Sequence, residues 1–259
     1  LPPARRFASR LFPSFTDGLV ALRAMARDDA LPDMTYLSDE EETRFAAAQA
    51  GVGPQGGGGF AGLGLKVVGM RGYTLEQGSL LLMGFEGSPT RVADRRRRAL
   101  RHARPAANLG SGPAKRWYSE RFDTPYIRDS LVDHGILVDT VETAASWSRL
   151  LDVYHAGGKA LQEALWEQGG AGLVLCHVSP VYVDGASLYY TFLGKASEGR
   201  EVAPWAAVKE SVTRAFVDAG GALSHHHGVG ADHAPSLGRA VGEAGPLALR
   251  ALKRELAPA

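Results

Sequence analysis

The sequence predicts an α+β fold in which an antiparallel sheet is covered by flanking helices. Apolar runs of strand length alternate with amphipathic helical stretches, and the pair Asp184-Gly185 between two such runs favours a hairpin. A doubly wound parallel sheet fits less well, because Gly62-x-Gly64 lacks the third glycine, the preceding strand and the following acidic residue of a dinucleotide-binding turn.

The N-terminal part of the chain predicts two helices. Ser14 is a plausible N-cap for the first. The apolar positions that follow share one helical face: Phe15, Leu19, Leu22 and Met25. A polar helix is expected from Asp39 to Ala50. Residues 51–64 are so rich in glycine that ordering them is entropically costly, and we expect a loop or insertion there.

A strand followed by a helix comes next. Residues 79–85 are apolar, and Ser88-Pro89 then supplies an N-cap with proline at the first helical position. This helix carries a basic run that could grip phosphate but is typical of a solvated face: Arg91, Arg95, Arg96, Arg97, Arg98, Arg101 and Arg104. Residues 136–143 predict a strand, and Ser146 could cap a helix that reaches Gly169.

The C-terminal part predicts a hairpin and several helices. Residues 171–178 and 186–193 should form adjacent strands joined at 183–185. A helix from 202 to 219 should end at Gly220-Gly221, and helices from about Pro235 should close the chain.

Composition limits the class of protein and its partners. The chain has 259 residues, with 45% hydrophobic and 22% charged, which is ordinary for a globular protein. Lys+Arg 29 against Asp+Glu 28 gives no reason to expect a nucleic-acid partner. The single cysteine, Cys176, and the absence of a membrane-length apolar run or signal peptide predict a cytoplasmic setting. The missing initiator methionine suggests a piece of a longer protein.

The least ordinary feature is a run of three histidines, His225, His226 and His227, between Ser224 and Gly228-Val229-Gly230. We call Ser224 to Gly230 the histidine motif. If the segment is extended, alternation places His225 and His227 on one face and His226 on the other. The glycines let the backbone approach a flat ligand, and histidine suits acid/base chemistry near neutral pH.

A metal site is the competing interpretation, with His233 as a fourth imidazole. Adjacent residues converge on one ion less readily than pairs two or four positions apart, and no HExxH motif or cysteine pair lies nearby. We therefore predict no metal ligands here. A purely structural histidine run is the remaining alternative.

Tyr189 is a second candidate for acid/base chemistry. Alternation along the predicted strand places Ser187, Tyr189 and Thr191 on one face and Leu188, Tyr190 and Phe192 on the other. The polar face nominates Tyr189, although an ordinary half-buried strand tyrosine fits the same pattern. Cys176 lies in an apolar run and is expected to be a core residue, not a nucleophile.

Several segments, taken in chain order, resemble the C-terminal region of alkyldihydroxyacetonephosphate synthases, flavoproteins of the vanillyl-alcohol-oxidase superfamily. The matching segments are Phe12-Pro13-Ser14-Phe15, Phe85-Glu86-Gly87, Tyr126-Ile127-Arg128-Asp129, Glu142-Thr143 with Ser146-Trp147, Gly185-Ala186-Ser187-Leu188-Tyr189, and the histidine motif. The histidine motif is specific, whereas Phe-Glu-Gly and Glu-Thr are weak on their own. Ala231 and Ser236 depart from the family, which commonly has a basic and an aromatic residue there.

The resemblance implies that residues 1–259 form the substrate-binding cap domain of a FAD-linked oxidase, with a ferredoxin-like antiparallel sheet, and that a FAD-binding domain absent from this chain precedes it. It implies FAD as cofactor and exchange of the acyl group of acyl-dihydroxyacetonephosphate for a fatty alcohol, a step of ether-lipid synthesis. It assigns catalysis to Tyr189 and the three histidines, and contacts to the substrate's acyl or phosphate end to Arg128. It assigns cofactor contacts to His226, His227 and Gly228.

Two other functions stay open at this point. One is a FAD-linked oxidase or dehydrogenase that acts on a 2-hydroxy acid, and the other is a non-catalytic fragment or binding module. Peripheral membrane contact and homodimer formation are also open.

Overall fold

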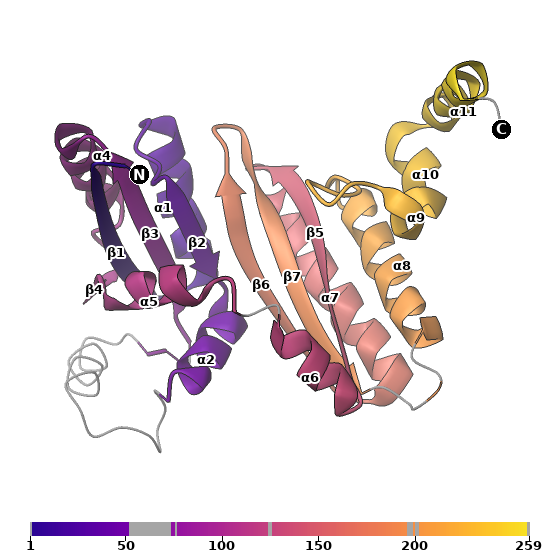
Figure 1. The fold of residues 1–259 in the computed structure, drawn as a ribbon, viewed down its shortest axis with the longest axis horizontal. Coiled ribbons are helices and arrows are strands. Elements are labelled where there is room, and N and C mark those ends of the chain that lie inside the picture. The colour runs from indigo at the N-terminus through magenta and orange to yellow at the C-terminus, as the bar shows by residue number, and fades with distance from the viewer. Residues whose placement is uncertain are drawn as a thin grey trace. The chain divides into compact units, whose positions relative to one another are not determined.

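The computed structural model describes residues 2–51, 74–75, 77–123, 126–195, 199 and 202–257 (Figure 1). Beyond Gly51, the predicted glycine-rich loop lies outside these residues. The strands form one seven-stranded antiparallel sheet in the order β4-β1-β3-β2-β6-β7-β5, flanked by helices. The predicted α+β class with an antiparallel sheet is therefore confirmed.

The chain divides into two compact units. Unit 1 comprises Leu1–Ser130 and Leu175–Tyr190, and unit 2 comprises Leu131–Val174 and Thr191–Ala259. The strands are β1 (Ala4–Phe12), β2 (Met34–Ser38), β3 (Ser79–Gly87), β4 (Ala107–Gly110), β5 (Ile136–Ser146), β6 (Gly172–Val181) and β7 (Gly185–Lys195).

In unit 1, strand β3 is the central partner. It pairs with β1 along its whole length, from Ala4 opposite Gly87 to Phe12 opposite Ser79, and with β2 on its other side. The unit's helices are α1 (Phe15–Arg27), α2 (Glu40–Gln49), α4 (Pro89–His102) and α5 (Gly112–Glu120), while α6 (Ile127–Asp133) crosses the boundary to unit 2. Helices α1 and α4 pack together, and their buried side chains cover β1 and β3.

Unit 2 is built on β5 and two long helices, α7 (Leu150–Gly169) and α8 (Val202–Asp218), which pack against each other. Gly157 of α7 allows this close approach, because a Cβ at that position would collide with the ring of Phe216 in α8. The chain then continues through α9 (Gly230–His233), a 3-10 turn (Ala234–Ser236), α10 (Leu237–Val241) and α11 (Ala244–Leu256).

Most predicted elements are confirmed. Ser14 caps α1 by accepting the N–H of Asp17, and Asp39 caps α2 by accepting the N–H of Glu42. The predicted hairpin is present, with the N–H of Tyr182 donating to the carbonyl of Gly185 at 2.8 Å. No helix among the described residues is long and apolar enough to span a membrane.

Two expectations about element boundaries are wrong. The first element is the strand β1, which the sequence did not reveal because its arginines interrupt the apolar alternation. Ser146 does not cap α7, since β5 extends through Ser146 and the helix begins at Leu150 without a side-chain cap. Strands β2 and β4 and helices α5 and α6 were not predicted either.

Candidate active site

The histidine motif lies in an irregular segment of unit 2 that follows α8 and is tied to β5. The N–H of Ala222 donates to the carbonyl of Ala144 at 2.8 Å, and the hydroxyl of Thr143 donates to the carbonyl of Ala222 at 2.6 Å. Gly221 makes this approach possible, because a Cβ there would lie 2.9 Å from the Thr143 Oγ1. The loop that carries the histidines is thus held to β5 by two hydrogen bonds of Ala222, before the motif begins.

Glu142 of β5 is the residue around which the motif is arranged. Its side chain is only 1% exposed, and its Oε1 accepts the backbone N–H of His227 at 2.7 Å. Its Oε2 lies 2.8 Å from Nδ1 of His226 and 3.8 Å from Nδ1 of His225. Neither contact has hydrogen-bond geometry, so Oε2 is buried without a hydrogen-bond partner.

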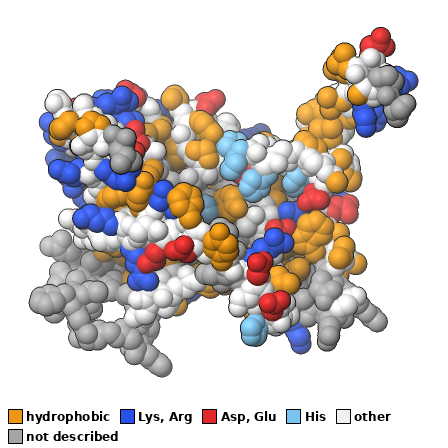
Figure 2. Space-filling model, viewed as in Figure 1, with side chains coloured by type: hydrophobic (Ala, Val, Ile, Leu, Met, Phe, Trp, Pro, Cys, Tyr) orange, Lys and Arg blue, Asp and Glu red, His pale blue; other side chains and the backbone are white. Residues whose placement is uncertain are grey.

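The expected alternation of the three histidines is wrong. The backbone bends at each of His225, His226 and His227, so the first two imidazoles face the same carboxylate, with their Nδ1 atoms 3.0 Å apart. Contrary to expectation, the adjacent histidines His225 and His226 therefore converge in this segment. Histidine side chains reach the surface on the face drawn in Figure 2, and the His226 side chain is 59% exposed.

His233 does not join this group. Its side chain is buried, and its Nδ1 lies 3.2 Å from Oγ1 of Thr213 in α8. Burial, followed by the positive charge of Lys209, holds the pKa of His233 below its ordinary value. The proposed role as a fourth imidazole beside the motif is therefore not supported by its position.

A buried cation on α8 was missed by the sequence reasoning. Lys209 is 9% exposed, and its Nζ donates to the carbonyl of Thr140 at 2.9 Å and lies 3.2 Å from Asp139. Burial opposes ionisation of Asp139, yet its pKa is lowered because the Trp205 indole and the Thr140 backbone donate to it and Lys209 is close. These contacts hold α8 against β5 at Asp139 and Thr140, which precede Glu142 on the same strand.

Tyr189 lies in unit 1 and is half-buried on β7. Leu188, Tyr190 and Phe192 are buried as expected, but Ser187, which was expected on the polar face with Tyr189, is buried as well, so the predicted alternation holds only in part. Its ring stacks on His177 of β6, with centroids 4.9 Å apart and planes at 19°. His177 stacks on Tyr36 at 4.0 Å, and Tyr36 meets Trp117 at 5.2 Å. Tyr189 therefore belongs to a column of four aromatic rings in contact with one another.

The carboxylate of Glu42, which is half-buried, contacts two rings of this column. Oε1 of Glu42 accepts the hydroxyl of Tyr36 at 2.8 Å and lies 3.1 Å from Nδ1 of His177. Burial, followed by the charge of Glu42, raises the pKa of Tyr36 well above its ordinary value. Sequence reasoning missed Glu42, Tyr36 and His177 because they lie on three separate elements and share no motif.

Arg128 and Cys176 are the remaining residues that the sequence analysis considered for a functional role. Arg128 is exposed on α6 and belongs to unit 1. Cys176 is fully buried, and burial raises the pKa of its thiol well above the ordinary value, as expected of a core residue. Tyr189 and Arg128 thus lie in unit 1, whereas the three histidines and Gly228 lie in unit 2.

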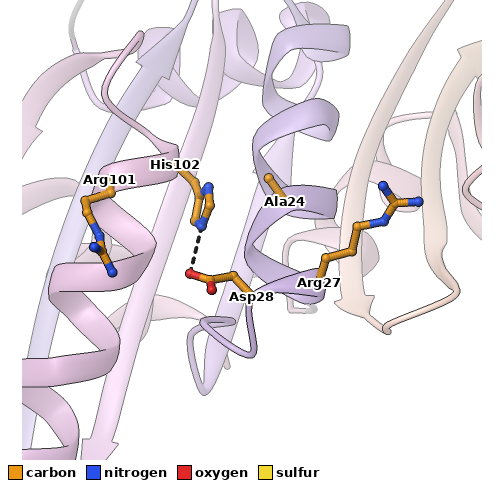
Figure 3. Close-up of a pocket in the computed structure, with 5 residues that line it drawn as sticks. All are labelled: Ala24, Arg27, Asp28, Arg101 and His102. Carbon is orange, nitrogen blue, oxygen red and sulfur yellow. Dashed lines mark hydrogen bonds and ion pairs between the residues drawn. The ribbon is translucent and has the colours of Figure 1, made fainter.

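A surface hollow in unit 1 contains none of the predicted site residues. It is lined by Ala24, Arg27, Asp28, Arg101 and His102. Figure 3 shows Asp28 and His102 pointing toward each other, while Arg27 points away from the pair. Nε2 of His102 lies 3.0 Å from Oδ2 of Asp28. The hydrogen bond from His102, then that from Arg98, lowers the pKa of Asp28.

Three of the seven arginines in the predicted basic run form ion pairs with aspartates. Arg95 pairs with Asp33, Arg97 with Asp94, and Arg98 with Asp28. These pairs support the interpretation of the run as a helix surface.

Comparison with known proteins identifies the family. The model of the family described as FAD linked oxidases, C-terminal domain, matches residues 1–259. The chain is 31% identical to the alkyldihydroxyacetonephosphate synthase of Dictyostelium discoideum and 29% identical to that of Trypanosoma brucei brucei. Both matches cover 100% of this chain but 43% of the relative, so the chain spans less than half of their length.

Solved structures agree with this result. A structure of alkyldihydroxyacetonephosphate synthase superposes with a TM-score of 0.77 at 28% identity, covering 100% of this chain and 44% of that one. Substrate-bound p-cresol methylhydroxylase shares the fold, with a TM-score of 0.59 at 10% identity over 99% of this chain and 51% of that one. The expected resemblance is therefore confirmed, and the chain belongs to the family of FAD linked oxidases, C-terminal domain.

Proposed function

We propose that this chain is the substrate-binding part of a FAD-dependent enzyme that exchanges the acyl group of acyl-dihydroxyacetonephosphate for a fatty alcohol. The observation that carries the proposal is the histidine motif, held by the buried Glu142 with two imidazoles turned toward one carboxylate oxygen. Two relatives that match the full length of this chain are alkyldihydroxyacetonephosphate synthases. A convergent set of titratable groups is typical of an acid/base site.

The residues of the motif are compatible with a flavin. The His226 side chain is 59% exposed, and Gly228, at φ +80°, has nothing within 4 Å of the position of a Cβ. A flat ring could therefore approach the backbone at Gly228 closely. We assign cofactor contacts to His226, His227 and Gly228, and FAD, when bound, would supply the chemistry of its isoalloxazine ring.

The exchange can be written without net oxidation. The bond between C1 of the substrate and the acyl oxygen breaks, a bond between C1 and the alcohol oxygen forms, and the alcohol proton is released as the carboxylate leaves. A proton that is taken from C1 during the exchange has to be returned to C1 before the product leaves. Tyr189 and the imidazoles of His225, His226 and His227 are each suited to hold or move these protons. The exposed Arg128 is suited to bind the leaving carboxylate or the phosphate.

The test uses the chain within its complete reading frame, loaded with FAD. Acyl-dihydroxyacetonephosphate and hexadecanol are supplied, and the alkyl product is measured by mass spectrometry. Tyr189→Phe should lower kcat by at least about 100-fold if its hydroxyl moves a proton. Arg128→Gln should chiefly raise KM for the acyl phosphate, whereas Tyr182→Phe, on the exposed turn after β6, should behave as the native protein.

Two results would reject this proposal. Flavin bleaching by 2-hydroxy acids without any alkyl product would instead indicate an oxidase or dehydrogenase of such acids. A protein that binds neither FAD nor substrate would indicate a non-catalytic module.

A further inference from the structure

Three potential ligand atoms converge in unit 2: Oε2 of Glu142, Nδ1 of His225 and Nδ1 of His226. Their separations are 2.8, 3.0 and 3.8 Å. Ligands bound tetrahedrally at the usual zinc–nitrogen and zinc–oxygen distances lie about 3.3 Å from each other. Two of the separations are about 0.3–0.5 Å shorter than this value and one is about 0.5 Å longer, so small movements of the side chains would bring the three atoms into a tetrahedral site.

The state of Glu142 is the second observation that indicates a cation. The side chain is 1% exposed, and Oε2 is buried without a hydrogen-bond partner, although it points toward both imidazole nitrogens. A buried, unsatisfied carboxylate oxygen is costly, and ligation of a cation would remove that cost. The other oxygen is held by the N–H of His227, as ligating carboxylates commonly are.

The two imidazoles are compatible with the same conclusion. Their Nδ1 atoms lie 3.0 Å apart, at hydrogen-bond distance, and a bound ion would replace that hydrogen bond, because both Nδ1 atoms can act as ligands only when the proton of each neutral ring is on Nε2. The exposed His226 leaves the group accessible from solvent, so that water can complete the coordination.

We propose that Glu142, His225 and His226 form a binding site for a divalent first-row transition metal ion of the zinc class. Two imidazoles and one carboxylate suit zinc, cobalt or nickel, whereas magnesium and calcium favour sites made of oxygen ligands alone. The site lies entirely within unit 2 and requires neither flavin nor substrate. Binding of the ion can therefore be measured without flavin or substrate, although an ion on Nδ1 would leave only Nε2 of His225 and His226 for the proton transfer proposed above.

The test measures metal binding by the 259-residue chain, purified without a histidine tag and stripped of metal with a chelator. Calorimetric titration with Zn²⁺ at neutral pH should show one ion per chain with a dissociation constant in the micromolar range or tighter. Co²⁺ should give the visible absorption of a tetrahedral complex, and excess Mg²⁺ should not displace Zn²⁺.

Variants assign the site. His226→Asn, which alters an exposed side chain, and Glu142→Gln should each weaken Zn²⁺ binding at least about tenfold. His102→Asn is the matched control, because it removes a histidine that faces one carboxylate, Asp28, outside the site, and it should bind Zn²⁺ as the native chain does. Only weak, non-stoichiometric binding by the native chain, or tight binding that survives in folded His226→Asn, would overturn the proposal.

Discussion

The backbone N–H of His227 donates to Oε1 of Glu142 at 2.7 Å, across 85 residues of sequence. Glu142 lies on β5, and His227 lies in a segment without regular secondary structure. Such segments cannot pair their backbone groups internally, so a buried side-chain acceptor replaces the partner that a strand or helix would provide. This bond therefore fixes the position of the histidine motif on the sheet.

We predict that Glu142→Ala destabilises the chain by about 1–3 kcal/mol more than Glu142→Gln does. Both changes remove the carboxylate charge, but only glutamine keeps an oxygen that can accept the N–H of His227. Urea unfolding of the two variants measures the difference.

Glu120→Ala is the surface control for that comparison. Glu120 pairs with Arg116 on the exposed side of α5 and should contribute about 1 kcal/mol or less. Equal stability of Glu142→Ala and Glu142→Gln would show that the bond to His227 does not hold the motif.

The contact between α7 and α8 predicts opposite effects for two neighbouring glycines. Gly157→Ala would place a methyl group in the buried ring of Phe216 and should destabilise the chain by about 1–3 kcal/mol. Gly158→Ala meets nothing within 4 Å and should stabilise α7 by up to about 1 kcal/mol, because alanine is the better helix former. Thermal unfolding of both variants measures this. The packing of α7 on α8 would be contradicted if both substitutions were stabilising.

Sequence reasoning succeeded where the signal is local. Ser14 and Asp39 were predicted to begin helices, and both accept N–H groups of the first helical turn. It failed for β1, where Arg5 and Arg10 occupy positions that an alternating strand would give to uncharged residues. The partners of these arginines, Glu86 on β3 and Asn108 on β4, are far away in the sequence and could not be anticipated.

In the candidate site, too, local features could be predicted from the sequence and long-range contacts could not. The three histidines and Tyr189 were proposed as site residues from residue type, order and the family resemblance, and their roles stay predictions. The bends that turn His225 and His226 to the same side depend on pairing of Ala222 with β5, and the carboxylate they meet comes from Glu142. Long-range contacts of this kind leave no periodic pattern in the sequence, so neither the convergence nor the column on Tyr189 could be predicted.

The buried His233 predicts a pH dependence in the acidic range. Since burial lowers the pKa of His233 in the folded chain, the unfolded chain binds the proton first as the pH falls below about 6.5. The unfolded state then carries more protons, so the free energy of unfolding decreases with falling pH. His233→Asn should make this decrease smaller.

The measurement is urea unfolding between about pH 7.5 and pH 5, with a chelator present so that bound metal does not contribute. His155→Asn removes an exposed imidazole from α7 and is the matched control. If His233→Asn and the native chain lose stability equally over this range, burial of His233 does not control its protonation.

Tyr36 predicts a second pH dependence, at the alkaline end and in unit 1. Its pKa is raised by burial and by the charge of Glu42, so the folded chain keeps the phenolic proton that the unfolded chain loses near pH 10. The unfolded state then binds fewer protons, and the free energy of unfolding falls as the pH rises through that range. Tyr36→Phe cannot ionise and should show a shallower fall.

Tyr36→Phe also removes the hydrogen bond to Glu42 and should be less stable at neutral pH by about 1.5–3 kcal/mol. The two effects can be separated, because the lost bond lowers the whole curve whereas the lost ionisation changes only its alkaline slope. Unfolding between about pH 8 and pH 11 measures both, and Tyr126→Phe, whose side chain is exposed, is the control. A slope for Tyr36→Phe as steep as that of the control would mean that Tyr36 ionises freely in the folded chain, which is incompatible with a ring enclosed between Trp117 and His177.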